Sequence, residues 1–131
     1  MDIVNVLVAA GAAWLFGAVW YIPLYPRWMV AAGVKAGPDG GPEGGASPIQ
    51  FLVAALAMLM VSAMMGYLFS VASITSVTQG ASIGLGIGLF IISPWIMMDN
   101  VYAKRPLALT LIDGGYAVFG CAIIGTLLVA L

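Results

Sequence analysis

The sequence has very little charge, with four Lys and Arg residues and five Asp and Glu residues among 131. Charged side chains make up 7% of the chain and hydrophobic ones 63%, whereas a soluble domain is about one quarter charged. So few charges cannot cover the surface of a soluble domain, and we predict one membrane domain over residues 1–131 that uses lipid as its solvent. The scarcity of basic residues also argues against nucleic acid as a partner.

Histidine is absent, and Cys121 is the only cysteine. The chain therefore lacks the usual ligand of haem, zinc and copper, and it lacks the commonest general base. One cysteine cannot form an internal disulfide bond or a redox pair, so we interpret Cys121 as a small packing residue. No nucleophile motif and no carboxylate cluster with metal spacing occurs. We expect no cofactor, no metal site and no enzymatic activity.

Four long apolar segments lie at about residues 3–22, 49–71, 80–98 and 107–131. About 20 helical residues at ~1.5 Å each cover the ~30 Å hydrocarbon core of a bilayer. The pattern predicts an all-α fold, a polytopic membrane protein with a four-transmembrane-helix bundle. We expect Pro23 and Pro26 to end the first helix and Pro94 to bend the third. Residues 32–48 hold six glycines and three prolines, which predicts a flexible loop.

The basic residues predict the orientation in the membrane. Arg27 and Lys35 follow the first apolar segment, and Lys104 and Arg105 lie between the third and the fourth. Because positively charged loops stay in the cytoplasm, we place loops 23–48 and 99–106 there and both termini outside. The first apolar run is longer than the core of a signal peptide and is interpreted as a retained span.

Small residues recur every four positions in each predicted span. In lipid, such rows let helix backbones approach closely, which replaces the missing hydrophobic force between helices. We predict helix packing, within one chain or between copies, at Ala13, Gly17, Ser62, Gly66, Gly80, Gly84, Gly88 and Gly125.

Polar residues concentrate in the connection between the third and fourth spans. Asp113 lies six residues beyond Leu107, about 9 Å along a helix axis, at or just below the membrane interface. One interpretation is a structural polar clamp, with Asp113 accepting hydrogen bonds from Arg27, Trp20 or Tyr21. The other is a proton or ion relay, or an anchor for a substrate headgroup. The candidate site comprises Asp113, Tyr116, Asp99, Asn100, Trp20, Tyr21 and Arg105.

The surface acid of this group has a simpler explanation. Asp99 can pair with Lys104 or Arg105 at the membrane surface, where such pairs contribute little to stability.

Several motifs, taken in order, resemble a known family. They are Gly17-Ala-Val-Trp-Tyr-Ile-Pro23 with a nearby Trp28, then Asn100-Val-Tyr-Ala-Lys-Arg-Pro-Leu107, then Leu111-Ile-Asp-Gly-Gly-Tyr116. Together they resemble the small membrane proteins grouped as domain of unknown function 1761. The resemblance implies a four-span protein of the bacterial cytoplasmic (inner) membrane without an established activity. Members often carry a histidine after the final tyrosine, where this chain has Ala117, so a mechanism that needs that imidazole does not transfer.

Three functional hypotheses follow. The first is a binding or assembly element, either a homo-oligomer or a subunit of a larger membrane complex, packed through the small-residue faces. The second is a small oligomeric proton- or cation-coupled transporter or channel that uses Asp113. The third is an enzyme or carrier with a bound lipid or apolar ligand, whose pocket the aromatic and methionine side chains would form.

Overall fold

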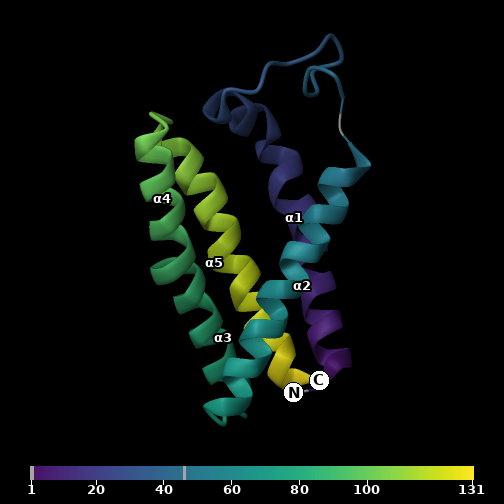
Figure 1. The fold of residues 1–131 in the computed structure, drawn as a ribbon, viewed down its shortest axis with the longest axis vertical. Helices are drawn as coiled ribbons and strands as arrows, with labels where there is room; N and C mark the ends of the chain where they lie inside the picture. Colours follow the sequence, from purple (N-terminus) through teal and green to yellow (C-terminus); the bar gives the residue numbers. More distant parts are fainter. Residues whose placement is uncertain (1, 46) are drawn as a thin grey trace.

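The structure, a computed structural model, describes residues 2–45 and 47–131; Met1 and Ala46, the latter within the predicted loop 32–48, lie outside the described residues. Four helical segments are long and apolar enough to cross a membrane, which confirms the all-α four-helix bundle. The third is one continuous rod in three parts. The elements are α1 (Ile3–Ala32), α2 (Pro48–Val71), α3 (Val77–Ile87), the π-helical η1 (Gly88–Ile92), α4 (Ser93–Tyr102) and α5 (Leu107–Ala130) (Figure 1).

Short polar side chains cap the N-termini of two of the long helices. The Asp2 carboxylate accepts a hydrogen bond from the Val4 amide at 3.0 Å at the start of α1. At the start of α2, the Ser47 hydroxyl accepts one from Ile49 at 3.3 Å, and Pro48 occupies the first helical position. Both arrangements satisfy amides that have no partner in the first turn, so the membrane spans begin where the sequence supplies a cap.

Three helices end in a left-handed residue. Gly33, Ser73 and Lys104 follow α1, α2 and α4 with φ of 75°, 56° and 57°. In each case the next amide bonds to the carbonyl five residues back, as Arg105 does to Asn100 at 2.9 Å. This arrangement satisfies carbonyls at the helix end and reverses the chain within a few residues. The turn after α4 thereby brings α5 back alongside α4.

The predicted end of the first span was wrong. We expected Pro23 and Pro26 to stop the helix near residue 22, but both lie inside α1, which continues to Ala32. A proline removes one helical hydrogen bond, and neighbouring helices can compensate for that loss in a membrane protein. Here α1 is held to α5 by side-chain hydrogen bonds to Asp113 on both sides of the prolines, from Tyr21 before them and from Trp28 after them. The predicted loop 23–48 is therefore helical over its first ten residues, 23–32.

The third span contains a widened turn directly before its proline. The π-helical residues Gly88–Ile92 precede Ser93 and Pro94, and the Ser93 amide bonds back to the Gly88 carbonyl. A π turn of this kind is a recognised site of helix distortion. The helical span itself runs from Val77 to Tyr102, longer at both ends than the predicted 80–98.

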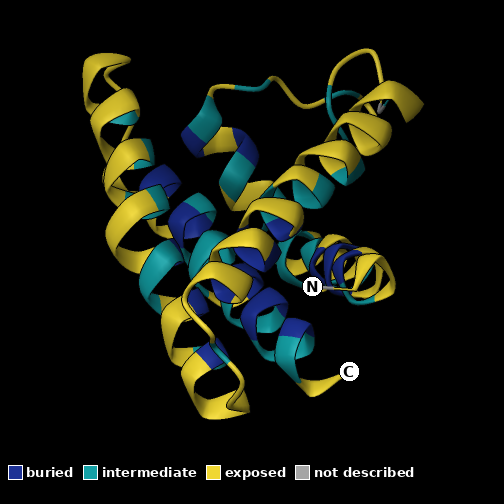
Figure 2. Cartoon of the chain, turned by 60° about the horizontal axis from the view of Figure 1, so that its bottom comes forward, coloured by how far each residue is buried: buried dark blue, intermediate teal, exposed yellow. Residues whose placement is uncertain are grey.

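Helix α5 is the central element of the bundle. It contacts α1, α3, η1 and α4 extensively, and α2 only slightly. Figure 2 shows that buried residues concentrate on α5, whereas the outer helices are mostly exposed. Because the surrounding solvent is predicted to be lipid, exposed apolar side chains on those helices are expected. The site described below lies on the α1-facing side of α5.

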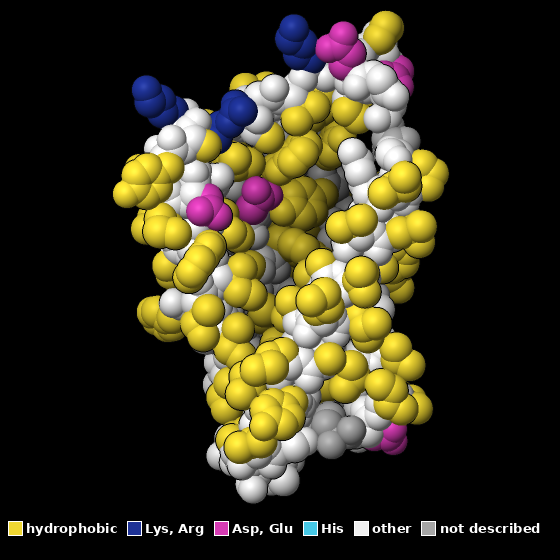
Figure 3. Space-filling model, in the orientation of Figure 1, with side chains coloured by type: hydrophobic (Ala, Val, Ile, Leu, Met, Phe, Trp, Pro, Cys, Tyr) yellow, Lys and Arg dark blue, Asp and Glu magenta, His cyan; other side chains and the backbone are white. Residues whose placement is uncertain are grey.

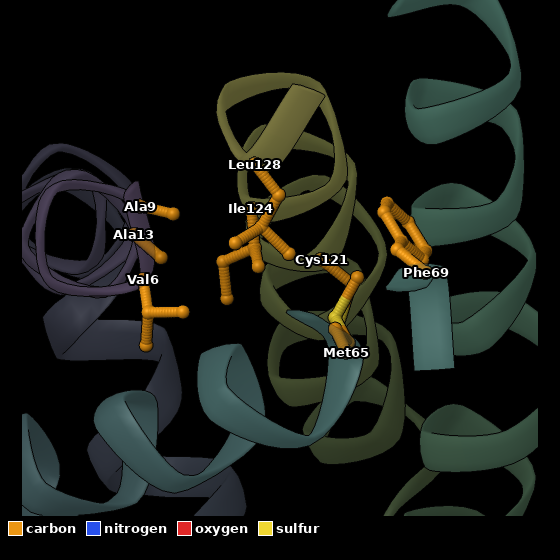
Figure 4. Packing of buried hydrophobic residues seen from close by; sticks show 8 residues of the cluster. All are labelled: Val6, Ala9, Ala13, Met65, Phe69, Cys121, Ile124 and Leu128. Carbon is orange, nitrogen blue, oxygen red and sulfur yellow. The ribbon is translucent and has the colours of Figure 1, made fainter. Parts of the chain in front are cut away.

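The hydrophobic core lies toward the end of the bundle that holds both termini (Figure 1). In Figure 4, Ile124 and Leu128 of α5 lie between small residues of α1 and the side chains of α2. Ser62 within α2 is fully buried, and its hydroxyl donates to the Val6 carbonyl at 2.8 Å. The cluster consists of Val6, Ala9, Ala13, Met65, Phe69, Cys121, Ile124 and Leu128.

The glycine row of the third span faces α5 of the same chain. A β-carbon on Gly80 would collide with the Gly125 backbone, and one on Gly84 would collide with the Cys121 carbonyl. Gly88 lies equally close to the Ala117 backbone. The backbones of the two helices therefore touch along three turns, which we call the glycine seam.

Candidate functional site

Asp113 is held by two aromatic donors from α1. The Tyr21 hydroxyl donates to Asp113 Oδ1 at 2.7 Å, and the Trp28 indole nitrogen donates to the same oxygen at 3.1 Å. All three side chains are partly buried. Tyr21 and Trp28 are seven residues apart, or two helical turns, so they lie on one face of α1. The continuation of α1 past its prolines is what brings Trp28 to the carboxylate.

Two further bonds join the same pair of helices. The Trp20 indole donates to the Ile112 carbonyl at 2.8 Å, and the Tyr116 hydroxyl donates to the Ala13 carbonyl at 2.8 Å. Gly17 leaves room for that hydroxyl, because a β-carbon there would lie 3.1 Å from it. Aromatic donors thus connect α1 and α5 over several turns, and we call this contact the aromatic seam.

The rings of the aromatic seam form one continuous chain of contacts. Neighbouring ring centroids are 5.4–6.4 Å apart along it, within the range in which aromatic pairs attract one another. The chain runs Phe119, Trp20, Phe16, Tyr116, Tyr21, Trp28 and Tyr25.

A second set of polar contacts joins α4 to the other side of α5 and does not involve the Asp113 side chain. The Asn100 amide donates to the Thr110 hydroxyl at 3.0 Å, and the Ser93 hydroxyl donates to the Gly114 carbonyl at 3.1 Å. Asn100 was a predicted site residue, but its partner places it in a separate α4–α5 contact. These bonds fix the hairpin that presents Asp113.

Two predicted site residues, Asp99 and Arg105, form no bond with Asp113 within the described residues. Asp99 is exposed and forms no ion pair with Lys104 or Arg105 within the described residues, contrary to expectation. The turn after α4 directs Arg105 elsewhere: its guanidinium lies against Gly33, where a β-carbon would collide with it. The Asp99 pairing was therefore wrong, and Arg105 contacts the end of α1 instead.

Sequence reasoning missed Trp28 as a donor to Asp113. The candidate donors were Arg27, Trp20 and Tyr21, and of these only Tyr21 reaches the carboxylate. Trp20 bonds to the neighbouring backbone carbonyl, and Arg27 is exposed. If the predicted helix had continued through the prolines, the seven-residue spacing would have placed Trp28 on the same face as Tyr21 and identified Trp28 as a donor.

The second carboxylate oxygen of Asp113 is open. Oδ2 accepts no hydrogen bond from any described residue. Every buried side-chain nitrogen or oxygen atom among these residues has a hydrogen-bond partner. Because Oδ2 has none, it is not buried. No basic side chain in residues 2–45 and 47–131 forms an ion pair with Asp113. A carboxylate held through one oxygen by neutral donors can accept a further hydrogen bond or bind a cation through the other.

A hollow lies beside this carboxylate. Figure 3 shows it between the first half of α2 and the wall formed by α4 and α5, with two acidic side chains on that wall. The only acids of α4 and α5 are Asp99 and Asp113. The first half of α2 diverges from α5 and leaves apolar side chains exposed, including Leu52 at 69% and Leu56 at 56%. The walls are thus apolar apart from these carboxylates.

The described residues contain no group of three or more His, Cys, Asp or Glu that could hold a metal ion. Cys121, buried in the core against α3, lies outside the hollow's polar wall. The carboxylates on this wall can offer hydrogen bonding and charge pairing, and of the two only Asp113 is fixed in place by donors.

The fold and the site define a bundle of four apolar helices, with one half-buried carboxylate between an aromatic seam and a hollow. Its chain belongs to the family described as protein of unknown function (DUF1761), whose model matches residues 4–129. This match confirms the resemblance found in the sequence motifs. No curated protein and no solved structure matches the chain.

Proposed function

We propose that this protein is a membrane-embedded binding element that holds an amphiphilic molecule in the hollow beside Asp113. The observation that supports this function is the open Oδ2 atom of a carboxylate whose other oxygen is fixed by Tyr21 and Trp28. Binding sites typically combine apolar walls with a few placed polar groups. A fixed carboxylate beside an apolar hollow has that composition, and no catalytic set accompanies it.

Tryptophan fluorescence in lipid nanodiscs tests the proposal. Trp14 and Trp95 are 37% and 67% exposed, so both are replaced by Phe to remove quenching by bulk lipid. Trp20 and Trp28 then report on the aromatic seam. Three amphiphiles are added that share one bromine-labelled tail and carry a cationic, a neutral or an anionic head. At least one of them should quench the Trp20 and Trp28 fluorescence to a plateau as its concentration rises. Only unsaturable quenching by all three would refute a binding function.

The small-residue faces support oligomer formation less than the sequence suggested. The glycine seam occupies Gly80, Gly84 and Gly88 within one chain, and Ala13 is likewise buried inside the bundle. A homo-oligomer or a complex subunit stays a prediction, and it would have to use apolar side chains that are exposed in the single chain, such as those of α2. Particle mass in nanodiscs decides it: a single copy, with no partner after mild crosslinking, would count against both.

A proton- or cation-coupled transporter is the second candidate. It is favoured by the same open oxygen, because acidic groups inside membrane spans commonly mark ion paths. Flux into proteoliposomes, compared between the native chain and Asp113→Asn, separates it from simple binding. Equal flux in the two proteins, or none for the cations tested, removes this candidate.

The distribution of basic residues supports a cytoplasmic location for the end of the bundle that carries Arg27, Lys35, Lys104 and Arg105. We propose a bacterial inner-membrane location with both termini outside, and the N and C ends do lie at one end of the bundle (Figure 1). A C-terminal reporter that is active only outside the cytoplasm should be active. A signal from a reporter that needs the cytoplasm would reverse the topology.

A further inference from the structure

We infer that the molecule bound in the hollow is an amphiphile with an ammonium head, whose nitrogen pairs with Asp113 Oδ2. This inference rests on the proposed binding function and names the chemical class of the ligand. It also implies that the two oxygens of the carboxylate have different partners. Oδ1 accepts the bonds from Tyr21 and Trp28 that fix its position, and Oδ2 meets the ligand.

The charge of the site selects the class of head group. Asp113 lies about 9 Å along α5 from Leu107, and within the described residues no Lys or Arg pairs with it. A carboxylate at this depth is costly unless a positive charge or sufficient donors accompany it. An ammonium group supplies both the charge and, when it carries hydrogen, a donor for Oδ2. A second carboxylate or a phosphate would instead be repelled.

The aromatic wall favours the same choice. Tyr21 and Trp28 approach edge to face, with centroids 6.4 Å apart, directly at the carboxylate. Aromatic rings attract ammonium groups through their electron-rich faces, and the Tyr21 and Trp28 donors that could bind an anion are already occupied by Asp113 Oδ1. A carboxylate with adjoining rings is therefore selective for a cation over a neutral head of similar size.

The apolar tail and the route of entry follow from the surroundings. The first half of α2 leaves apolar side chains exposed, among them Leu52 and Leu56. Figure 3 shows the hollow on the outer face of the bundle, lined mostly by hydrophobic side chains. The hollow opens between helices that are apolar enough to cross a membrane. An ammonium amphiphile that first partitions into lipid can therefore enter from the side.

Three probes with one bromine-labelled alkyl tail test the inference: the trimethylammonium, the alcohol and the carboxylate. Quenching of Trp20 and Trp28 is measured in nanodiscs with the Trp14→Phe and Trp95→Phe background. The ammonium probe should bind at least about ten-fold more tightly than the alcohol, because its charge is attracted to the carboxylate and to the aromatic rings without any hydrogen bond. The carboxylate probe should bind most weakly.

Asp113→Asn should remove this preference. An amide can still accept the bonds from Tyr21 and Trp28, so the hollow is kept while its charge is lost, and the ammonium and alcohol probes should then bind within about two-fold of each other. Glu43→Gln is the matched control, because it removes an exposed acid from the loop before α2 and leaves the α4–α5 wall of the hollow unchanged. It should leave the preference intact.

The outcomes separate this inference from the function on which it rests. Saturable binding of all three probes with equal affinity keeps the binding function and overturns the ammonium inference. An equal loss of preference in Asp113→Asn and Glu43→Gln overturns it too, because general surface charge would then be responsible. If Asp113→Asn fails to fold, the probe ranking in the native background and in Glu43→Gln still decides between these results.

Discussion

Helix α5 is held on two sides by different means. On the α3 side, Gly80, Gly84 and Gly88 bring backbone against backbone, with no side chain between them. On the α1 side, large rings fill the space and donate hydrogen bonds to Asp113 and to backbone carbonyls. Both seams stabilise helix association where apolar burial alone has no driving force.

The difference between the seams indicates which one can carry function. The glycine seam is closed, since any added atom meets main chain, and it offers no polar group to a ligand. The aromatic seam is built from side chains that can adjust, and it exposes one oxygen of Asp113. This difference is why the proposed binding function is placed at the aromatic seam, while the glycine seam packs two helices together.

The largest effect is expected from Gly84→Ala in the glycine seam. The new β-carbon would overlap the Cys121 carbonyl, and because that obstacle is main chain, the helices must separate. We expect a loss of about 3 kcal/mol in the free energy of unfolding, measured by reversible denaturation in mixed micelles. Gly86→Ala is the control on the same span, since a β-carbon there meets nothing within 4 Å. Equal stability of the two variants would contradict a closed seam.

A smaller loss of stability, which a second substitution should relieve, is expected from Gly115→Ala in the aromatic seam. Its β-carbon would lie 2.6 Å from Cζ2 of the Trp20 ring, so a side chain is the obstacle. The cost should be about 1–2 kcal/mol in the native background. In a Trp20→Phe background it should fall below about 0.5 kcal/mol, because the smaller ring gives room. An undiminished cost there would show that this seam is as rigid as the first.

The smallest effect is expected from Tyr21→Phe. The substitution removes the 2.7 Å bond to Asp113 and keeps the ring, and we expect a loss of about 1 kcal/mol, as for other hydrogen bonds between membrane helices. In an Asp113→Ala background the same change should cost almost nothing. Tyr25→Phe serves as control, since the Tyr25 ring stacks on Trp28 while its hydroxyl bonds to no described residue. Identical losses in the two variants would remove the role assigned to the Tyr21 hydroxyl.

The architecture could be predicted from the sequence because lipid imposes simple rules. Apolar runs of the right length, separated by polar residues, specify four helices, and all four are present. The end of α1 could not be predicted by those rules. Proline disfavours a helix locally, but the hydrogen bonds of Tyr21 and Trp28 to a residue far along the chain hold the helix past Pro23 and Pro26.

The candidate site was predicted in part for the same reason. Asp113, Tyr21, Trp20 and Tyr116 lie on the α1–α5 contact, because an acid within an apolar run requires donors and aromatic residues nearby can supply them. Trp28 was missed because its position depends on the unexpected extension of α1. The hollow could not be inferred either, since it results from the divergence of α2, and no local pattern encodes that angle.

The central claim is that neutral aromatic donors, and no basic side chain of the chain itself, hold Asp113. Solid-state NMR in bilayers tests it directly, by measuring dephasing of the Asp113 carboxyl carbon by selectively nitrogen-labelled residues. The difference from Asp113→Asn isolates this carboxyl among the aspartates. We predict strong dephasing by labelled Trp indole, which Trp28→Phe abolishes, and none by labelled Arg or Lys. Strong dephasing by Arg or Lys would reveal an internal counter-ion and contradict the account.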